Sequence, residues 1–404
     1  MPDLIVVGGG PAGLMGAITA AERGKSVLLL EYLPAPGRKL LASGAGKCNF
    51  TNILEPEEMA RRFIVNDRFL LPALRHFSSA ALREWFFRRG VSAVTDDDFH
   101  FFPSSKKASD LLNLLLNECR RLHVDIQLRS EVQEIISANG TVEGVIVNGK
   151  KISAPAVLLA CGGRSYPKLG ATGKGYLPAE KAGHKLVPTV PALVGLKLKE
   201  AWGSSMPGII LPTAQMTYGK RSGRTGELIF THSGISGPAV LDLSGEVNKA
   251  LLNTPEVQLH LALNAEYSKQ DWQELFQKWR KENGKKQLST LLAAEFPAQF
   301  VQLLLELSHI PADRKAALLP AQEQNSLLNN LTALPVTANG NDGWLKAMAT
   351  AGGVSPEEVK ANSLESKLVK GLYFAGEMLD VGAPCGGYNI QWAFSSARLA
   401  ASKC

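Results

Sequence analysis

The stretch Leu4-Ile5-Val6-Val7-Gly8-Gly9-Gly10-Pro11-Ala12-Gly13 decides the fold of this chain. Its apolar, β-branched beginning predicts a buried strand, and the glycines that follow predict a tight turn. Gly8, Gly10 and Gly13 have the G-x-G-x-x-G spacing that brings a backbone close to a pyrophosphate and lets a helix pack tightly on a strand. The apolar sequence resumes at Leu14, which predicts a helix whose first N–H groups face the phosphates.

A second apolar run, residues 26–30, predicts another buried strand, and it ends at Glu31. This carboxylate lies about 20 residues past the glycines, where an acid accepts the ribose hydroxyls of an adenosine. Strand, glycine turn, helix and acid together predict a dinucleotide site. The alternative is a glycine-rich turn in an unrelated α/β protein.

Length and composition narrow the class of protein. The chain has 404 residues, too many for one core, with 45% hydrophobic and 20% charged residues, as in ordinary globular proteins. No apolar run approaches the length of a membrane span, and Pro2-Asp3 leads straight into the first strand, so we expect neither a membrane anchor nor a signal peptide. The five cysteines are scattered and odd in number, which favours a reducing cytoplasm. None has zinc-ligand spacing, so we expect no metal.

The net charge of +7 is unevenly distributed. Between Arg61 and Arg89 the chain has seven arginines, opposed within that stretch only by Asp67 and Glu84. Such a patch attracts phosphate backbones. A solvated helical face is the alternative, and charge alone favours it.

A long loop rich in small residues follows the second strand. Residues 34–52 cannot build a core, and loops of this length are usually functional. Arg38 and Lys39 would meet phosphate charge there. Cys48 is the one reactive side chain of the loop, and a buried packing role is an equally good interpretation of it.

The pattern of apolar residues changes twice in the middle of the chain. Residues 55–125 have helical spacing, broken at 100–104, and short strands follow up to residues 156–160, which should return to the parallel sheet. From Pro188, short alternating segments predict a small antiparallel sheet or barrel, interrupted by a helical block. We therefore expect a first dinucleotide-domain part at 1–190, an inserted β domain at 191–264 and 331–348, a helical subdomain at 265–330, and a second dinucleotide-domain part at 349–404.

The closing segment repeats the opening pattern. An apolar strand at 371–374 reaches Gly376-Glu377 and Asp380, a glycine-rich loop carries Cys385, and a helix is expected at 389–401. Its N-terminus also offers N–H groups to a polar ligand. Two distant strand–loop–helix units are best explained by one long ligand that contacts both, and FAD has the right length.

Four motifs resemble the BaiN/RdsA (YhiN-like) family of FAD-dependent oxidoreductases. They are Gly8 to Gly13 with Glu31, the ten residues 43–52, residues 230–238 and residues 385–393. The resemblance covers essentially the whole chain, and residues 43–52 depart from it only conservatively, with Lys47 where arginine is common. It implies an α/β fold, with a Rossmann-type FAD domain built from both chain ends around a β-barrel-like insert that carries a helical subdomain.

The glycine-rich units and this resemblance together predict the site. The expected FAD contacts are Gly8, Gly10, Pro11, Ala12, Gly13, Glu31, Arg38, Lys39, Ser43, Gly44, Gly46, Cys48, Asn49, Val132, Ala160, Gly162, Gly376, Glu377, Asp380, Gly387, Tyr388, Asn389 and Ile390.

The resemblance implies reduction of a uridine of 23S ribosomal RNA to dihydrouridine, with NAD(P)H as electron donor. Other members are linked to reduction of steroid-like enones or to amine oxidation, and a non-enzymatic flavin-binding protein is a further alternative. Reduction of the uracil 5,6 double bond requires a hydride at one carbon and a proton at the other. A thiol, whose ordinary pKa is about 8.5, can donate that proton at neutral pH. We expect Cys385 to be this acid, with Cys48 as second choice.

Basic residues outside the arginine-rich stretch would extend an RNA track around the flavin site. They are Lys106, Lys107, Lys150, Lys151, Lys220, Arg221 and Arg224.

Overall fold

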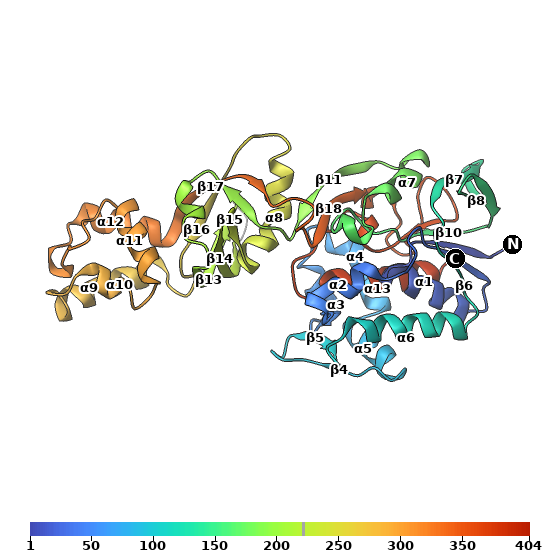
Figure 1. Ribbon diagram of the computed structural model, residues 1–404, viewed down its shortest axis with the longest axis horizontal. Helices are drawn as coiled ribbons and strands as arrows, with labels where there is room; N and C mark the ends of the chain where they lie inside the picture. The colour runs from blue at the N-terminus through green and yellow to red at the C-terminus, as the bar shows by residue number, and fades with distance from the viewer. Residues whose placement is uncertain (220–222) are drawn as a thin grey trace. The chain divides into compact units, whose positions relative to one another are not determined.

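The computed structural model describes residues 1–219 and 223–404. They form two units, one made of Met1–Pro191 with Met348–Cys404 and the other of Ala192–Ala347 (Figure 1). The first unit is thus built from both ends of the chain.

A five-stranded sheet forms the centre of the first unit, in the order β19-β10-β1-β2-β6 with every neighbouring pair parallel. All residues of β1, β2, β10 and β19 are buried, as expected for a parallel sheet covered on both faces. The last strand of the chain lies beside β10, which confirms a Rossmann-type fold closed by the C-terminal segment. The strands are β1 (Leu4–Val7), β2 (Val27–Leu30), β6 (Asp125–Gln127), β10 (Val157–Leu159) and β19 (Leu372–Phe374).

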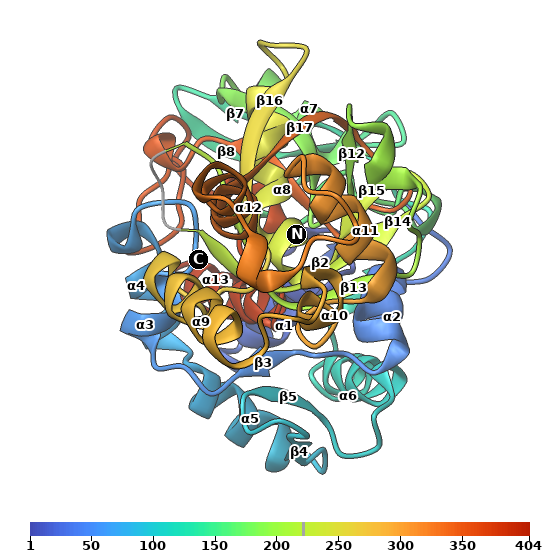
Figure 2. The same ribbon diagram turned by 90° about the vertical axis from the view of Figure 1, so that its left-hand side faces the viewer.

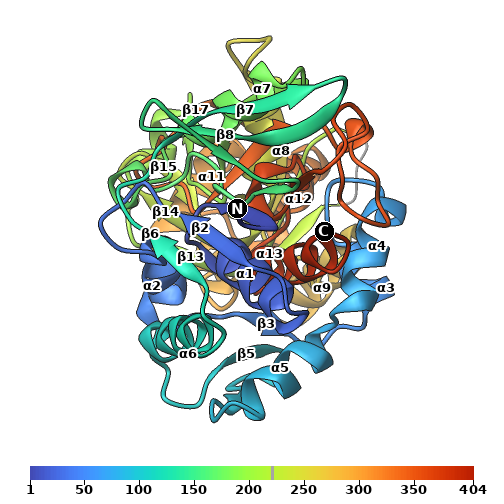
Figure 3. The same cartoon turned by 90° about the vertical axis from the view of Figure 1, so that its right-hand side faces the viewer.

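Two helices that begin at glycine turns pack against each other in this unit. They are α1 (Pro11–Glu22) and α13 (Tyr388–Ala401), and Figure 3 shows them side by side. Helix α6 (Ala108–Arg121) also contacts α1. A Cβ at Gly16 would lie 2.5 Å from the Leu158 side chain, so only glycine lets α1 approach β10 this closely.

Short strands interrupt the helical region that the sequence predicted over 55–125. Helices α3 (Pro56–Ala60), α4 (Asp67–His76) and α5 (Ser79–Phe87) are followed by β4 (Ala93–Val94) and β5 (His100–Pro103). Strand β5 pairs antiparallel with β4 and with β3 (Thr51–Asn52). The sequence located the break at 100–104 but missed β3 and β4, because two-residue strands exist only through their pairing partner.

Two further small sheets complete the first unit. One is the antiparallel meander β7 (Val132–Ala138), β8 (Thr141–Val147) and β9 (Lys150–Ser153). The other pairs β11 (Leu186–Ala192) with β18 (Ala349–Val354).

The second unit contains a closed six-stranded antiparallel barrel of order β12-β15-β14-β13-β16-β17. Helix α8 (Pro238–Ala250) packs on β13 and β14 and was not predicted. Pro238 occupies the first helical turn after Gly237, and this Gly-Pro pair is the local sequence signal that could have revealed the helix. The strands are β12 (Leu196–Leu198), β13 (Ile210–Thr217), β14 (Arg224–Thr231), β15 (Gly234–Ser236), β16 (Val257–Ala262) and β17 (Leu334–Asn341).

A group of helices is inserted between β16 and β17, and Figure 2 views it end-on. Ser268 and Asp271 form a capping box at the start of the first helix, which Trp272 and Phe276 anchor in the core. Among the described residues, no helix combines the length and apolarity needed to cross a bilayer. The helices are α9 (Lys269–Glu282), α10 (Leu288–Leu292), α11 (Ala298–Leu307) and α12 (Ala321–Ala333).

Candidate functional site

The first glycine turn leaves room for a phosphate. A Cβ at Gly13 would lie 1.8 Å from the Gly8 carbonyl oxygen, and Gly8 itself has φ +107, so neither position tolerates a side chain. A Cβ at Gly10, in contrast, would meet no heavy atom within 4 Å among the described residues. Gly10 is also the N-cap of α1, and no described side chain caps that helix, whose first residues are Pro11 and Ala12. The free helix N–H groups therefore fit the pyrophosphate of FAD.

Glu31 lies directly beside this turn. Its carboxylate accepts the Gly9 N–H at 2.6 Å and the Leu33 N–H at 2.8 Å, and the residue is buried. Burial raises the pKa of Glu31, although these N–H groups act in the opposite direction. The acid is thus held at the end of β2, next to the glycine turn. Ala160, at the end of β10, donates its N–H to the Val7 carbonyl and lies against Gly8.

Glu377 joins segments from four parts of the chain. Its carboxylate accepts Lys39 Nζ at 2.7 Å, the Thr350 N–H at 2.8 Å and the Gly163 N–H at 3.2 Å. The buried Ser165 hydroxyl also donates to Glu377 and contacts Lys39. The network brings together Lys39 and Glu377, both predicted, with Gly163, Thr350 and Ser165, which were not. The predicted Gly162 precedes Gly163, and a Cβ there would lie 3.8 Å from Glu377 Oε2.

The loop that carries Cys48 is folded around β5. Cys48 is fully buried with φ +58, and its N–H donates to the Ser43 carbonyl at 3.0 Å. The Asn49 amide, in its hydrogen-bonded orientation, donates to the carbonyls of Thr51 and Phe101. Burial raises the pKa of the Cys48 thiol to about 11. The geometry therefore favours a packing role for this thiol. In the same loop, Gly44 and Gly46 both have positive φ, and Arg38 begins the short helix α2 (Arg38–Ala42).

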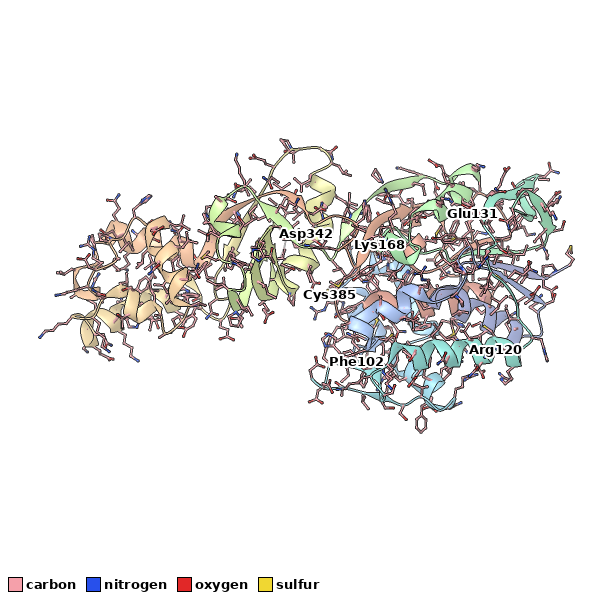
Figure 4. All side chains as sticks on the ribbon, viewed as in Figure 1. Phe102, Arg120, Glu131, Lys168, Asp342 and Cys385 are labelled. Atoms are coloured by element: carbon pink, nitrogen blue, oxygen red, sulfur yellow. The ribbon has the colours of Figure 1, made fainter. Side chains whose placement is uncertain are left out.

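The glycine-rich closing loop, which carries Cys385, is held by contacts with β3, the strand that pairs with β5. Asn52 Nδ2 donates to the Gly386 carbonyl at 2.9 Å, and a Cβ at Gly387 would lie 2.7 Å from Thr51 backbone atoms. Cys385 precedes these glycines and is partly exposed. In Figure 4 it lies at the same end of the first unit as Lys168 and Phe102, whereas Arg120 and Glu131 lie toward the other end. The predicted thiol is thus accessible while its loop is fixed.

The other predicted residues of the closing segment hold this loop. Asp380 accepts the Gly352 N–H at 2.8 Å, and the Gly376 N–H donates to Ser396 Oγ at 2.9 Å. Tyr388 is buried at the start of α13, and the Asn389 side chain donates to the Ala383 carbonyl at 3.4 Å. Ile390 is partly buried in the next position. Val132 lies elsewhere, at the start of β7, paired with Val147 of β8.

Two side chains near Cys385, those of Tyr166 and His100, were not predicted from the sequence. Tyr166 has φ +59, a conformation that costs a bulky residue about 1–2 kcal/mol and that concentrates at functional sites. Burial, and then the negative charge of an ionised Cys385, raise the pKa of Tyr166. His100 Nε2 would lie 3.0 Å from a Cβ at Gly386. Neither residue belongs to a glycine motif, so only the folded chain reveals them.

The arginine-rich stretch is more neutral than its sequence indicated. Arg62, Arg75 and Arg88 pair with glutamates at 3.6, 2.7 and 2.6 Å, and Arg89 binds two more at 2.8 and 2.9 Å. Within the stretch itself only Asp67 and Glu84 oppose these charges, but the fold brings acids from other segments against them. These acids are Glu22, Glu57, Glu58 and Glu118.

Three of the five described residues of the extended basic track are also paired, and no ion pair is described for Lys107 and Lys150. Lys106 binds Asp96 at 2.6 Å, Lys151 binds Glu143 at 3.2 Å and Arg224 binds Glu246 at 3.2 Å. The predicted contribution of Lys220 and Arg221 falls outside the described residues.

Comparison with known proteins defines the class. The family described as HI0933-like protein Rossmann domain matches residues 2–403, and the chain belongs to this family. It is 33% identical to the ribosomal RNA dihydrouridine synthase of Escherichia coli, across 98% of this chain and 96% of the relative. The Haemophilus influenzae enzyme of the same name is also 33% identical, with 97% and 96% covered. The 3-dehydro-bile acid delta(4,6)-reductase of Clostridium scindens is 32% identical, with 98% and 97% covered.

Solved structures share the fold at low identity. The 3-ketosteroid delta1-dehydrogenase of Sterolibacterium denitrificans has a TM-score of 0.52 at 13% identity, with 100% of this chain and 99% of that chain covered. The E. coli quinol fumarate reductase FrdA has a TM-score of 0.51 at 16% identity, with 100% and 69% covered. Family and fold together confirm the predicted class, a flavin-dependent oxidoreductase with a Rossmann-type FAD domain.

Proposed function

We propose that this enzyme reduces a uridine of 23S ribosomal RNA to dihydrouridine. The observation that carries the proposal is the similarity to two ribosomal RNA dihydrouridine synthases over nearly the full chain, including the inserted second unit. An RNA-modifying enzyme of this kind works in the cytoplasm, which suits the scattered cysteines.

The residues around the glycine turns would hold the cofactor. The α1 N-terminus would bind the pyrophosphate and Glu31 the adenosine ribose, while Lys39 and Glu377 would lie along the more distant part of FAD. Bound FAD, once reduced by NAD(P)H, would supply the hydride for the double bond. We propose that the other FAD contacts predicted from the sequence also bind the cofactor.

Cys385 would supply the proton. Its loop is fixed by Asn52 and by the close approach of Gly387 to Thr51, so the thiol is held in one place while staying partly exposed. The S–H bond breaks as a C–H bond forms at the second uracil carbon. General acid catalysis of this type contributes about 100- to 10,000-fold to a rate. Cys48 is the weaker candidate, since its burial opposes proton exchange with a substrate.

Reduction of a small enone is the second candidate, and the C. scindens relative favours it. An enone also takes one hydride and one proton, so Cys385 would play the same part. The pairing of most of the arginines in the 61–89 stretch weakens the case for a long RNA track. Arg61, Arg68 and Arg83 are the members for which no glutamate pairing is described. Arg83 lies over the Phe101 ring, so RNA contact would depend most on Arg61 and Arg68.

One experiment distinguishes the candidates. Purified holoenzyme with NADH or NADPH is incubated with 23S ribosomal RNA from cells that lack it, and dihydrouridine is measured by mass spectrometry. Parallel reactions contain a steroid enone or no acceptor, and a Gly13→Val variant without flavin serves as the blank. We expect dihydrouridine only with RNA and holoenzyme. Enone consumption without dihydrouridine would transfer the proposal to the small-molecule reaction, and no turnover of either would favour a non-enzymatic flavin protein.

A further inference from the structure

A carboxylate–imidazole pair lies beside the closing loop. Asp97 Oδ1 accepts the His100 N–H at 2.8 Å and the Phe99 N–H at 3.1 Å, while Oδ2 lies 2.5 Å from His100 Nδ1. The His100 backbone N–H and then its side chain hold the pKa of Asp97 well below its ordinary range, so this carboxyl is ionised. An ionised Asp97 fixes the imidazole ring with its Nδ1–H toward the carboxylate.

The other ring nitrogen faces the loop. His100 Nε2 lies 3.0 Å, and Cδ2 3.4 Å, from the position of a Cβ at Gly386, so the Nε2 edge of the ring points at this residue. Among the described residues, no hydrogen-bond partner of Nε2 occurs. Cys385 is the preceding residue, and adjacent Cα atoms are about 3.8 Å apart. The ring is 32% exposed, so water can reach it.

We propose that His100, oriented by Asp97, is the positioning residue that returns a proton to Cys385 after this thiol has protonated the substrate. The inference rests on the proposed reduction. In the step, the Nε2–H bond of the imidazolium breaks as a new S–H bond forms on the Cys385 thiolate. The neutral imidazole then takes a proton from water, so no electrons are gained or lost.

Other titratable groups lie near the Asp97–His100 pair. The negative charge of an ionised Cys385 raises the pKa of Tyr166, in the loop after β10, and the Tyr388 ring edge lies 3.1 Å from a Cβ at Gly386. Asp97 faces His100 on the opposite side. Tyr166 is itself a possible acid, and because burial raises its pKa it would hold its proton throughout the neutral range.

The test measures Cys385 directly. Holoenzyme is treated with iodoacetamide across a pH series, and alkylation of each cysteine is followed by peptide mass spectrometry. The variants are His100→Asn and Asp97→Asn, with His123→Asn as the matched control, because His123 has φ +56 and asparagine tolerates this backbone. The buried Cys119 and the partly buried Cys161, whose thiol pKa desolvation raises to about 12 in each case, are internal references.

We expect His100→Asn to move the midpoint of Cys385 alkylation upward by about one pH unit, a tenfold change in thiolate at neutral pH. His123→Asn should leave it unchanged. Product formation by His100→Ala should fall about tenfold or more and recover when free imidazole is added, which a merely structural loss would not show.

An unchanged alkylation midpoint in His100→Asn would overturn the inference, whatever the substrate. Loss of the response to added imidazole, with the midpoint shifted, would also overturn the proton return. A shifted midpoint in a protein that forms no dihydrouridine would support the His100–Cys385 pair and contradict only the proposed substrate.

Discussion

Two loops of the first unit each carry one cysteine, which is buried in one loop and partly exposed in the other. The loop at 43–52 turns Cys48 inward, with no exposed surface and a pKa raised to about 11. The closing loop leaves Cys385 partly exposed, one residue before Gly386, which the His100 ring approaches. The first loop ends in the two-residue strand β3, and the closing loop contacts that strand. The two thiols lie in glycine-rich loops but differ because only Cys48 is fully buried, and desolvation opposes the charge changes that acid catalysis requires.

The largest expected effect separates the two cysteines by activity. Cys385→Ala should keep its FAD and lose about 100- to 10,000-fold in product formation, because the proton donor is gone. Cys48→Ala should keep most of its activity. Both are measured as single-turnover reduction of the acceptor after the flavin has been reduced. Full activity of Cys385→Ala together with loss in Cys48→Ala would assign the acid to Cys48 and reverse the comparison.

Alkylation should rank the thiols in the same order. With a pKa of about 11, only about one Cys48 thiol in a thousand is ionised at pH 8, and only the thiolate reacts. Cys385 should be modified first and Cys48 about 100-fold more slowly or not at all in the folded protein. Raising the pH should increase Cys48 labelling, since the raised pKa leaves the thiol neutral until strongly alkaline solution. Equal labelling at pH 8 in folded protein would contradict this ranking.

The link between the closing loop and β3 can be broken at one glycine. Gly387→Ala adds a left-handed alanine, costing about 1–2 kcal/mol, and places its Cβ 2.7 Å from Thr51 backbone. Gly149→Ala is the control, because Gly149 has φ +78 and open space around it. Thermal or urea unfolding should show a larger loss for Gly387→Ala, and only this variant should slow the reaction. Equal losses would mean that the contact with Thr51 is not tight.

The smallest effect concerns the packing of the buried thiol. Cys48→Ala removes one fully buried atom group and should lower the free energy of unfolding by about 1 kcal/mol, as core truncations do. Cys119→Ala, equally buried in α6, should lose a similar amount. Urea denaturation compares them, and a Cys48 variant with unchanged stability would show that the loop does not depend on this side chain.

Several features followed from the residues themselves. The strand–turn–helix that begins with residues 4–13 requires glycine at Gly13, where a Cβ would lie 1.8 Å from the Gly8 carbonyl oxygen. Such a requirement can be recognised from the spacing of the glycines in the sequence. Buried strands at 27–30, 157–159 and 372–374 follow from continuous apolar runs, because parallel strands are covered on both faces. The four family motifs also identified the class of enzyme, because they can be recognised in the sequence without the fold.

Other features were decided only by tertiary contacts. The acids that pair with the arginines of the 61–89 stretch include Glu22 and Glu118, which are far from most of them in sequence. The two-residue strands at 51–52 and 93–94 have no periodicity of their own, and their partner strand creates them. Exposure of Cys385, burial of Cys48 and the approach of His100 to Gly386 depend on how distant segments meet. Local patterns encode backbone conformation and hydrophobic period, whereas solvation and charge pairing belong to the folded chain as a whole.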